Sequence, residues 1–371
     1  MAVPFFSLRD QTRALKEEVV QRLGDVIDAN GFANGPAVAR FEAELASYLG
    51  IGHVVCVNSG TSALHGALIA AGVQAGDEVI TVAHTWISTA WAISYTGARP
   101  VFVDVDRCTC GLDPRLLDRA VTPRTKAIIP VHLYGHPVDM DPILALAASR
   151  GIPVIEDCAQ AIGARYKGRK TGSMGLANAT SFYPSKNLGA YGEGGAVLTN
   201  DADVAARVRR LRDHAQAARH QHVELGFNWR MDGMQGAVLS VKLPHLDAWN
   251  RRRQAIASRY AAALQAMPGL ALVPTLGWAE PIWHIYPVFH EQRDRFRALL
   301  DQRDVQTGVH YPTPIHLQPV YAWLNVPRGS LPVSEWMAAT EVSLPMYPEM
   351  SDEQVNEVVD AVGDACKQLA G

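Results

Sequence analysis

The residue with the greatest chemical potential is a lysine that follows a predicted strand. Lys186 lies in Ala179–Val197 (ATSFYPSKNLGAYGEGGAV), where glycines crowd the positions behind it. A lysine in a confined pocket can lose its charge and become a nucleophile toward carbonyl groups. A lone lysine is more often a solvated surface residue, so this interpretation depends on other segments. The glycines do not form a GxGxxG pattern, which speaks against a nicotinamide-binding Rossmann domain.

A second segment has the features of a phosphate-binding turn. Val54–Leu64 (VVCVNSGTSAL) predicts a strand that ends in small polar residues, after which a helix begins at once. The free N–H groups of a first helical turn, together with the helix dipole, bind phosphate well. Gly60 would let a ligand approach the backbone closely. On this segment alone, Ser59 or Thr61 could equally serve only as a helix N-cap.

Two carboxylates end another apolar strand. Pro153–Ala164 (PVIEDCAQAIGA) delivers Glu156 and Asp157 to the carboxyl end of that strand. A carboxylate there could bind a metal ion, act as a base or hold a protonated ring nitrogen. It could also simply cap a helix or form a salt bridge. No spacing of His, Asp and Glu completes a metal site, so we expect no metal.

The elements that must position these residues alternate between short apolar strands and helices over the first two-thirds of the chain. The predicted strands are Val54–Val57, Glu78–Val82, Pro100–Val105, Lys126–His132, Pro153–Glu156, Thr180–Tyr183 and Ala196–Thr199, with helices at 61–71, 87–96 and 142–150. Such a pattern predicts an α/β fold with a mostly parallel central sheet flanked by helices. In these sheets ligands gather at the carboxyl ends of the strands. The polar clusters described above fall at those ends.

The remainder of the chain predicts a second, smaller domain. From Asp232 to Gln265 the pattern is that of a long helical region with a kink at Pro244. After it come a strand at Ile282–Phe289, a helix at Arg293–Arg303 and a final helix from about Ser351. We therefore expect a large domain over residues 1–245 and a smaller C-terminal α+β domain over residues 246–371.

Composition limits the classes of partner. The chain has 34 basic and 37 acidic residues and a formal net charge of −3, which gives no electrostatic footprint for nucleic acid or an anionic membrane. No apolar run reaches the roughly 20 residues that cross a bilayer. The cysteines are five, an odd number, and Cys108 and Cys110 have no second pair nearby, so we expect free thiols. No signal-peptide pattern begins the sequence, and we expect a cytoplasmic protein.

Together these segments resemble the DegT/DnrJ/EryC1/StrS family of sugar aminotransferases, which have the type I fold of enzymes that depend on pyridoxal phosphate. The resemblance covers nearly the whole chain. Besides the three segments above, it rests on HLYGHPVDMD (His132–Asp141), GFNWRMD (Gly226–Asp232), WHIYPV (Trp283–Val288) and HYPTPIHLQPVY (His310–Tyr321). The combination is specific, whereas no single motif would suffice.

The resemblance implies a role for each matching position. Lys186 would carry the cofactor aldehyde as a Schiff base and would move the proton after exchange with the substrate amine. Asp157 would pair with the pyridinium nitrogen, and Trp86 would stack on the ring. The other implied cofactor contacts are Gly60, Thr61 and Ser62 at the phosphate, Ser181 with a further hydroxyl, Gln160 near the ring hydroxyl, and Asn228, which would reach the phosphate of the neighbouring subunit's cofactor.

The resemblance also implies contacts with the substrate. Arg230 would meet an anionic substrate group, or would form only an ion pair at the subunit interface. His310 and Tyr311 would lie near the substrate, or would serve only to shape a proline-rich loop. Two positions depart from the family pattern. Ser185 stands where Gly often precedes the lysine, and Ala215 stands in the place of Gly within residues 211–224, a region that we expect to influence substrate choice.

The implied function is a ping-pong transamination. L-glutamate or L-glutamine would give its amine to the cofactor, which would cycle between pyridoxal phosphate and pyridoxamine phosphate. The amine would then pass to the keto group of a dTDP- or UDP-linked deoxy-keto-sugar, in a homodimer with shared active sites. Amination of a keto-cyclitol of the inosose type is the alternative within this class, and a non-catalytic regulatory protein with the same fold is the alternative outside it. Dehydratases of this family replace the lysine with His, so Lys186 counts against that activity.

Overall fold

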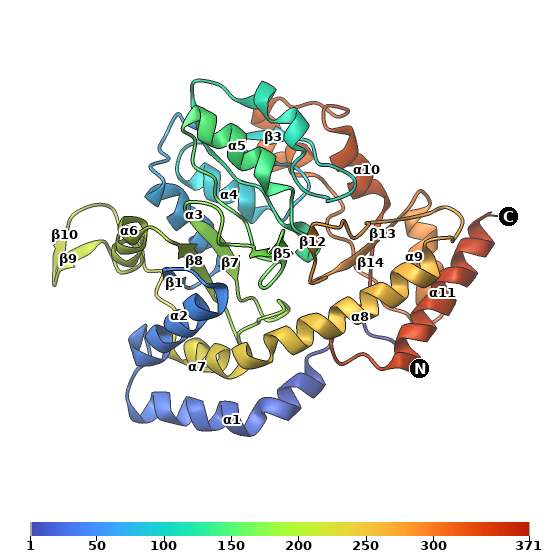
Figure 1. The fold of residues 1–371 in the computed structure, drawn as a ribbon, viewed down its shortest axis with the longest axis horizontal. Coiled ribbons are helices and arrows are strands. Elements are labelled where there is room, and N and C mark those ends of the chain that lie inside the picture. The colour runs from blue at the N-terminus through green and yellow to red at the C-terminus, as the bar shows by residue number, and fades with distance from the viewer. Residues whose placement is uncertain (1, 371) are drawn as a thin grey trace.

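A central β-sheet forms the heart of the larger part of the molecule (Figure 1). The computed structural model describes residues 2–370. One group of parallel strands has the order β3 (Arg99–Val103), β2 (Glu78–Val82) and β4 (Thr125–Ile128). A second has the order β1 (His53–Val57), β8 (Gly195–Thr199) and β7 (Asn178–Ser181), with β8 antiparallel to both neighbours. Residues 154–157 join the two groups through parallel bridges to residues 128, 131 and 179. The predicted α/β fold with a mostly parallel sheet is confirmed.

The predicted strand at Lys126–His132 ends early, since β4 stops at Ile128. The predicted strand at Pro153–Glu156 was wrong in kind. The segment forms isolated bridges instead of a regular ladder. The backbone N–H of Glu156 donates to the Asn178 side-chain oxygen at 3.0 Å, and Pro130 has no N–H with which to continue the ladder. A side-chain hydrogen bond and a proline therefore interrupt the backbone pairing at the centre of the sheet, while the backbone hydrogen bonds around them remain.

Helices cover both faces of the sheet. Val55 and Val57 of β1 pack into a core shared with α3 (Gly60–Ala70), while Val54 and Cys56 pack into another core shared with α2 (Gly35–Leu49). Alternate residues of a strand point to opposite faces, so the two cores lie on the two sides. The remaining helices of this part are α1 (Arg9–Asp28), α4 (Ser88–Tyr95), α5 (Met140–Arg150), α6 (Ala202–Arg212) and α7 (Gly233–Lys242), with 3-10 turns at Pro114–Leu116, Asp118–Ala120 and Leu133–Gly135.

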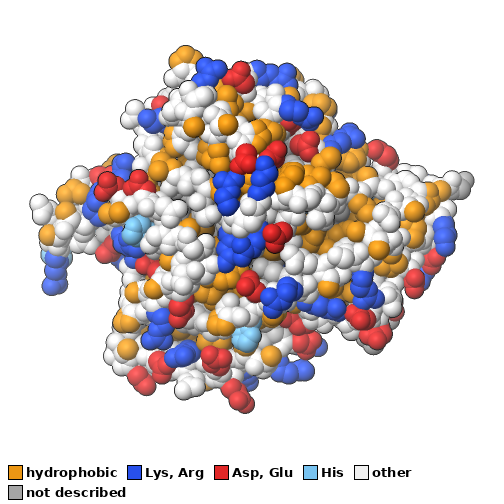
Figure 2. Space-filling model, in the orientation of Figure 1, with side chains coloured by type: hydrophobic (Ala, Val, Ile, Leu, Met, Phe, Trp, Pro, Cys, Tyr) orange, Lys and Arg blue, Asp and Glu red, His pale blue; other side chains and the backbone are white. Residues whose placement is uncertain are grey.

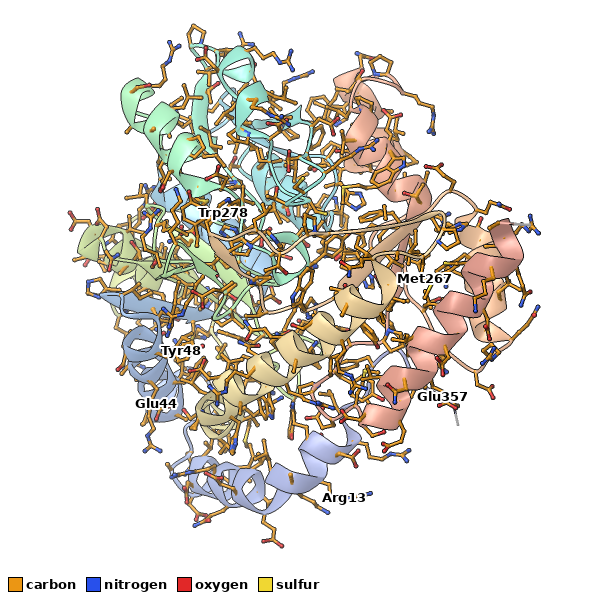
Figure 3. The ribbon with its side chains drawn as sticks, turned by 45° about the vertical axis from the view of Figure 1, so that its right-hand side comes forward. Arg13, Glu44, Tyr48, Met267, Trp278 and Glu357 are labelled. Atoms are coloured by element: carbon orange, nitrogen blue, oxygen red, sulfur yellow. The ribbon has the colours of Figure 1, made fainter. Side chains whose placement is uncertain are left out.

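A long helical bridge leads out of this layer. It consists of α7 and α8 (Leu246–Leu264), separated by a 3-10 turn at Leu243–His245 that contains the predicted proline kink. Figure 3 shows α8 running toward α11 (Asp352–Ala370). Met267, just beyond the end of α8, lies within 3.3 Å of the position that a side chain at Gly363 would take. The expected division at residues 245 and 246 falls at the end of the 3-10 turn.

The C-terminal part has an antiparallel sheet of its own. Its order is β11 (Leu270–Leu272), β13 (Tyr286–His290) and β14 (Glu341–Leu344). The helices α9 (Arg293–Asp301), α10 (Pro332–Thr340) and α11 accompany it, with 3-10 turns at Ile315–Leu317 and Pro319–Leu324. Val3 pairs with Val305, so the start of the described chain joins this sheet's side of the molecule.

Two small ribbons complete the fold. The strands β12 (Ala279–Glu280), β5 (Arg165–Tyr166) and β6 (Arg169–Lys170) form one of them. The hairpin of β9 (Gln216–Ala218) and β10 (Gln221–His222) forms the other, and it stands away from the body at the left of Figure 1. The segment that follows this hairpin presents exposed apolar side chains, since Val223 is 55% and Leu225 is 91% exposed.

The surface has no strong electrostatic bias on the face drawn in Figure 2, where basic and acidic side chains are interspersed. This agrees with the formal net charge of −3. Among the described residues, no helix combines the length and the apolar character needed to cross a bilayer. All five cysteines are free, as predicted.

Candidate active site

A cavity of about 540 Å³ opens where the sheet's carboxyl edge faces the C-terminal part. Its lining comes from the segments that follow β1, β2, β4 and β7 and from residues 284–285 and 310–311 of the C-terminal part. Of the residues predicted for the site, those in the lining are Gly60, Thr61, Trp86, Asp157, Gln160, Ser181, Lys186, His310 and Tyr311. Ligand sites at this edge are the rule for mostly parallel sheets. The structure thus brings together polar residues that are widely separated in the sequence.

Lys186 lies half-buried on the tight loop between β7 and β8. Its backbone N–H donates to the Tyr183 carbonyl at 2.8 Å. A side chain at Gly189 would come within 2.3 Å of the Pro184 carbonyl oxygen, so the loop can close only around a glycine. Burial lowers the pKa of the Lys186 amine to about 8, while the negative charge of Asp157 opposes that shift. The amine therefore has a larger neutral, nucleophilic fraction near neutral pH than an exposed lysine.

Asp157 is a buried carboxylate in the same cavity. Its Oδ2 accepts from the Thr89 hydroxyl at 2.8 Å, and its Oδ1 accepts from the Ala159 N–H at 3.1 Å. Burial raises its pKa, and these hydrogen bonds and the charge of Lys186 act in the opposite direction. A buried carboxylate that is oriented on two sides suits a cationic N–H donor placed in the cavity. The protonated ring nitrogen of a pyridine cofactor has that chemistry.

The N-terminus of α3 forms one end of the cavity. The Ser59 side chain caps it by accepting from the Ser62 N–H at 3.1 Å. A side chain at Gly60 would lie 2.7 Å from the Ser181 Cβ, so only glycine allows the helix start and Ser181 to approach each other. The Thr61 hydroxyl donates to Ser88 at 2.9 Å. Free helical N–H groups beside these hydroxyls provide donors for a phosphate.

Ser62 does not line the cavity, although it belongs to the same turn. Its hydroxyl donates to the Asn58 side-chain oxygen at 2.7 Å, and its N–H is engaged by the cap. The structure therefore gives Ser62 a part in shaping the turn. The phosphate contact predicted for it stays a prediction.

Aromatic and amide groups define the opposite wall of the cavity. Trp86 is 54% exposed, and its ring lies 5.4 Å from that of Tyr311, tilted by 46°. The Gln160 carbonyl oxygen accepts from the Tyr134 N–H at 2.6 Å, so its amide nitrogen is the group that donates to the Tyr311 hydroxyl at 3.2 Å. Gln160 therefore fixes the position of Tyr311 opposite Trp86.

Two predicted residues lie outside this cavity. Asn228 is exposed on the segment that pairs with Asp213. Arg230 forms an ion pair with Asp213, with 2.5 Å between Nη1 and Oδ1. Ala215, which stands in a glycine place of the family pattern, lies two residues after Asp213. Its φ of 52° is in the left-handed region, so the backbone keeps the conformation that favours glycine despite the methyl group.

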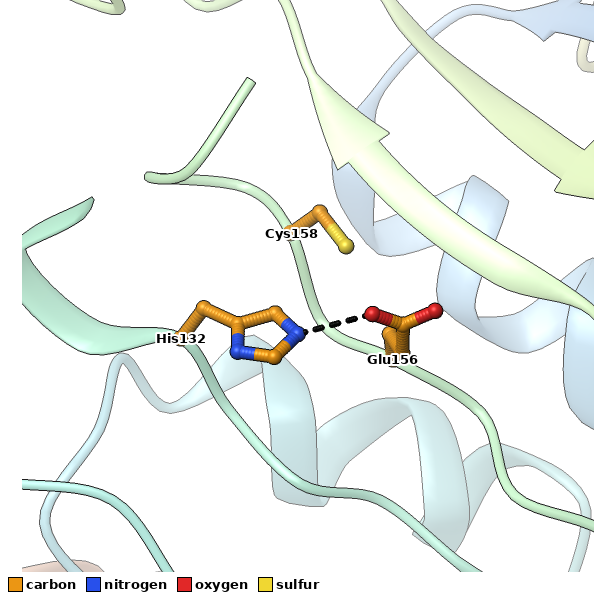
Figure 4. A group of neighbouring side chains, drawn as sticks. All are labelled: His132, Glu156 and Cys158. Carbon is orange, nitrogen blue, oxygen red and sulfur yellow. Dashed lines mark hydrogen bonds and ion pairs between the residues drawn. The ribbon is translucent and has the colours of Figure 1, made fainter. Parts of the chain in front are cut away.

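A buried cluster of His132, Glu156 and Cys158 has side chains close enough together to suggest a metal site (Figure 4). The His132 Nδ1 accepts from the Val138 N–H at 3.0 Å, so its Nε2 carries the proton and donates to Glu156 at 2.9 Å. The Glu156 carboxylate also accepts from the N–H groups of residues 172, 174 and 175. These contacts engage both nitrogens of His132 and both oxygens of Glu156. The cluster is a structural joint, by which we mean a set of buried hydrogen bonds that holds the HLYGH and EDCAQ segments together.

Several residues of the site were not identified from the sequence. Thr89 orients Asp157, and the signal for it was its place on a helix that follows a strand end. His284 lines the cavity and donates from Nδ1 to the Asn187 side-chain oxygen at 3.1 Å, because the Asn187 amide nitrogen is engaged with Asn250 and Ile282. The WHIYPV segment carries part of the family resemblance, yet nothing local in it indicates this contact.

Similarity to known proteins extends over nearly the whole chain. The model of the DegT/DnrJ/EryC1/StrS aminotransferase family matches residues 13–363. The chain belongs to this family. It is therefore an aminotransferase, and its cofactor is pyridoxal phosphate.

Three similar relatives have names of two kinds. The chain is 45% identical to a dTDP-3-amino-3,4,6-trideoxy-α-D-glucose transaminase of Streptomyces venezuelae, over 99% of this chain and 97% of that protein. It is 44% identical, over the full length of both chains, to a pleiotropic regulatory protein of Geobacillus stearothermophilus. A dTDP-3-amino-3,6-dideoxy-α-D-galactopyranose transaminase of Aneurinibacillus thermoaerophilus is 40% identical over 97% of this chain and 98% of that protein.

Solved structures agree with this family assignment. The structure of S. venezuelae DesV in complex with a ketimine intermediate has a TM-score of 0.97 and 44% identity, with 99% of each chain covered. The structure of Bacillus subtilis NtdA with its bound cofactor pyridoxamine phosphate has a TM-score of 0.92 and 31% identity, with 99% of this chain and 86% of that one covered. The expected fold and cofactor are confirmed at this level.

Proposed function

We propose that this protein transfers an amino group from L-glutamate or L-glutamine to the keto group of a nucleotide-linked deoxy-keto-sugar, carried by dTDP or UDP. The observation that carries the proposal is the presence of a depressed-pKa lysine and a buried carboxylate in one cavity, Lys186 and Asp157. The relatives named as dTDP-sugar transaminases support the choice of substrate class. The cavity's open rim of Trp86 and Tyr183, both about half exposed, suits a large substrate.

The cavity offers a group for each part of the cofactor. Lys186 would hold its aldehyde, Asp157 its ring nitrogen, and the start of α3 with Ser181 its phosphate. Bound pyridoxal phosphate supplies an electron sink that stabilises the charge left when a proton leaves the carbon bearing the amine. The Lys186 amine is the residue that would take up that proton and return it to the cofactor carbon that is bonded to the same nitrogen. Its lowered pKa keeps part of it neutral for this task.

The proposal includes a homodimer in which each site is completed by the other subunit. Asn228 is exposed, outside the cavity of its own chain, and it follows a hairpin that projects from the body (Figure 1). The exposed apolar residues of that segment, Val223 and Leu225, suit burial against a second copy. In this arrangement Asn228 contacts the phosphate of the partner's cofactor, and Arg230 lies at the interface beside it.

Borohydride reduction of cofactor-saturated protein tests the cofactor assignment directly. Peptide mapping should find the reduced adduct on Lys186, and Lys186→Ala should lose both the adduct and turnover. Lys16→Ala, a change of an exposed lysine on α1, should keep both. An adduct on another lysine, or full turnover by Lys186→Ala, would contradict the proposal.

A substrate panel tests the rest. With L-glutamate and L-glutamine as donors, dTDP- and UDP-linked keto-sugars should accept the amine, whereas an inosose should not. Turnover of the inosose alone would favour the keto-cyclitol alternative. Failure of every amino acid to convert the cofactor to its pyridoxamine form would favour the regulatory alternative. The relative from G. stearothermophilus that is named a pleiotropic regulatory protein is the reason to test it.

A further inference from the structure

His310 is held on three of its four polar groups by buried residues that play no part in the function proposed above. Its backbone N–H donates to the Glu341 Oε2 at 2.6 Å, and its carbonyl accepts from the Tyr134 hydroxyl at 2.6 Å. Its Nδ1 lies 2.8 Å from the Ser343 hydroxyl oxygen. The ring also stacks on Phe5, with 5.7 Å between centroids. Only Nε2 has no partner among residues 2–370, and the residue lines the cavity.

The hydroxyl of Ser343 links the imidazole to a carboxylate. Ser343 donates its single proton to the Glu341 Oε1. The same hydroxyl oxygen must then accept from His310, so the imidazole proton resides on Nδ1. Both Glu341 and Ser343 are fully buried on β14, where no water competes for these bonds. The chain Glu341–Ser343–His310 therefore fixes the tautomer and leaves the Nε2 lone pair without a partner, on a residue that lines the cavity.

We propose that Glu341 and Ser343 are positioning residues that hold His310 with Nε2 as a hydrogen-bond acceptor for an N–H of the substrate amino group. This inference rests on the proposed function, since it concerns the amine that the same site receives. A substrate ammonium has donors and no acceptor. An Nε2 lone pair therefore attracts it, whereas an Nε2–H group would repel it.

The electrostatic setting agrees with this assignment. Burial and, to a smaller extent, the Lys186 charge lower the pKa of His310 to about 4, so the ring is neutral at working pH. Burial raises the pKa of Glu341 to about 7, and its hydrogen bonds from Ser343 and His310 with the charges of Arg293 and Arg297 limit the rise. Above pH 7 the carboxylate is therefore predominantly ionised, as the direction of the Ser343 hydrogen bond requires.

The substitution Glu341→Gln should reverse the chain. The amide oxygen of the new Gln must accept from the backbone N–H of His310. Its NH₂ group would then face Ser343 and donate to that hydroxyl. Ser343 would then donate to Nδ1, and the imidazole proton would move to Nε2. Ser343→Ala should leave Nδ1 of His310 without its hydrogen-bond partner, so that neither tautomer is fixed. Thr340→Val is a matched control, since it removes a buried hydroxyl that bonds only to the Trp336 carbonyl beside β14.

Ring ¹⁵N NMR of the cofactor-loaded protein at pH 8.5, with the His310 signals assigned by difference from His310→Gln, reads the tautomer. The wild type and Thr340→Val should have the proton on Nδ1, and Glu341→Gln should have it on Nε2. An Nε2-protonated wild type, or an unchanged tautomer in Glu341→Gln, would overturn the inference. This readout needs no substrate, so failure of the proposed sugar substrate would not affect it.

Single-turnover conversion of the cofactor by L-glutamate supplies the second measurement. In Glu341→Gln the half-saturating concentration of L-glutamate should rise about tenfold, the effect of losing one hydrogen bond to a charged group, with the limiting rate changed less than about twofold. Thr340→Val should match the wild type in both. Equal half-saturation in Glu341→Gln and Thr340→Val would refute the acceptor role, even if both variants reacted.

Discussion

At the scale of single residues, the site depends on an amine whose protonation is set by its surroundings. Lys186 is attached to a tight loop, and burial moves its pKa to about 8. The residue's chemistry thus depends on the cavity around it as much as on its identity. The same holds for Asp157, whose two oxygens are oriented by Thr89 and Ala159.

The lowered pKa predicts how fast apoprotein takes up pyridoxal phosphate. Only the neutral amine attacks the aldehyde, and its fraction grows about tenfold per pH unit below the pKa and then levels off. The attachment rate should therefore rise up to about pH 8 and become flat above it. Stopped-flow absorbance between pH 6 and 10 measures this. A rate that keeps rising through pH 10 would mean that Lys186 behaves as an exposed lysine.

The close approach of Gly60 to Ser181 allows a steric test at the start of α3. In Gly60→Ala the new methyl group would lie 2.7 Å from the Ser181 Cβ, and relief of such overpacking costs about 1–3 kcal/mol. Calorimetry should show a lower melting temperature, and titration should show weaker binding of pyridoxal phosphate. The double variant Gly60→Ala with Ser181→Gly should recover the melting temperature. Gly24→Ala on α1, where nothing lies within 4 Å of the added methyl, should not lower stability.

At the scale of elements, the structure is held together by joints between segments that end at the same edge. The His132–Glu156 pair connects the segment after β4, the bridging residues 154–157 and the turn at residues 172–175. In the same way, β14 of the C-terminal sheet supplies the carboxylate that holds the loop of His310. The positions of the catalytic segments therefore depend on elements remote from them in sequence.

The Glu156 joint gives the third prediction. Glu156→Gln would leave at least one buried N–H group facing an NH₂ group, and such a loss costs about 1–3 kcal/mol for each donor left unsatisfied. Calorimetry at pH 7 should show a clearly lower melting temperature, while Glu280→Gln, at an exposed position on β12, should stay close to the wild type. A chelator should leave the wild-type melting temperature unchanged, because hydrogen bonds fill this joint. A large drop with the chelator would instead indicate a metal.

The difference in stability between the wild type and Glu156→Gln should depend on pH in a definite direction. Burial alone would raise the pKa of Glu156, but its hydrogen bonds from His132 and from the backbone N–H groups lower it below 4.5. The stabilising effect of the carboxylate is therefore present above pH 4.5 and is lost as the pH falls through its folded-state pKa. The difference in stability between the wild type and Glu156→Gln should shrink in that acidic range.

At the scale of the whole molecule, the proposed shared site predicts complementation between two defective chains. If Asn228 serves the partner's cofactor, Lys186→Ala and Asn228→Ala each impair every site of their own homodimers. A mixed dimer would contain one site with both changes and one site with neither. Co-expression of the two variants should therefore restore turnover that neither has alone. Activity no greater than the sum of the separate variants would contradict a shared site.

Much of the architecture was predictable from local signals. Apolar strands, helix starts and a proline at residue 244 are encoded over a few residues, so the strands of the large sheet and the kink between α7 and α8 could be predicted, whereas the helices α1 and α2 were missed. Lys186 and Asp157 were also selected from local segments, and the structure places both in one cavity, while their roles stay a prediction. The strand expected at Pro153–Glu156 was harder to predict, because a distant side chain, Asn178, takes one of its hydrogen bonds.

The sequence by itself indicated the kind of chemistry, through a lysine, a carboxylate and a polar helix start at the ends of predicted strands. Only the tertiary structure decided which hydrogen bonds and burial tune them. Thr89 lies on α4, His284 just before β13 and Glu341 on β14, and no spacing in the sequence relates them to Lys186. The physical reason is that a pKa or a tautomer depends on neighbours in space, and long-range folding selects those neighbours.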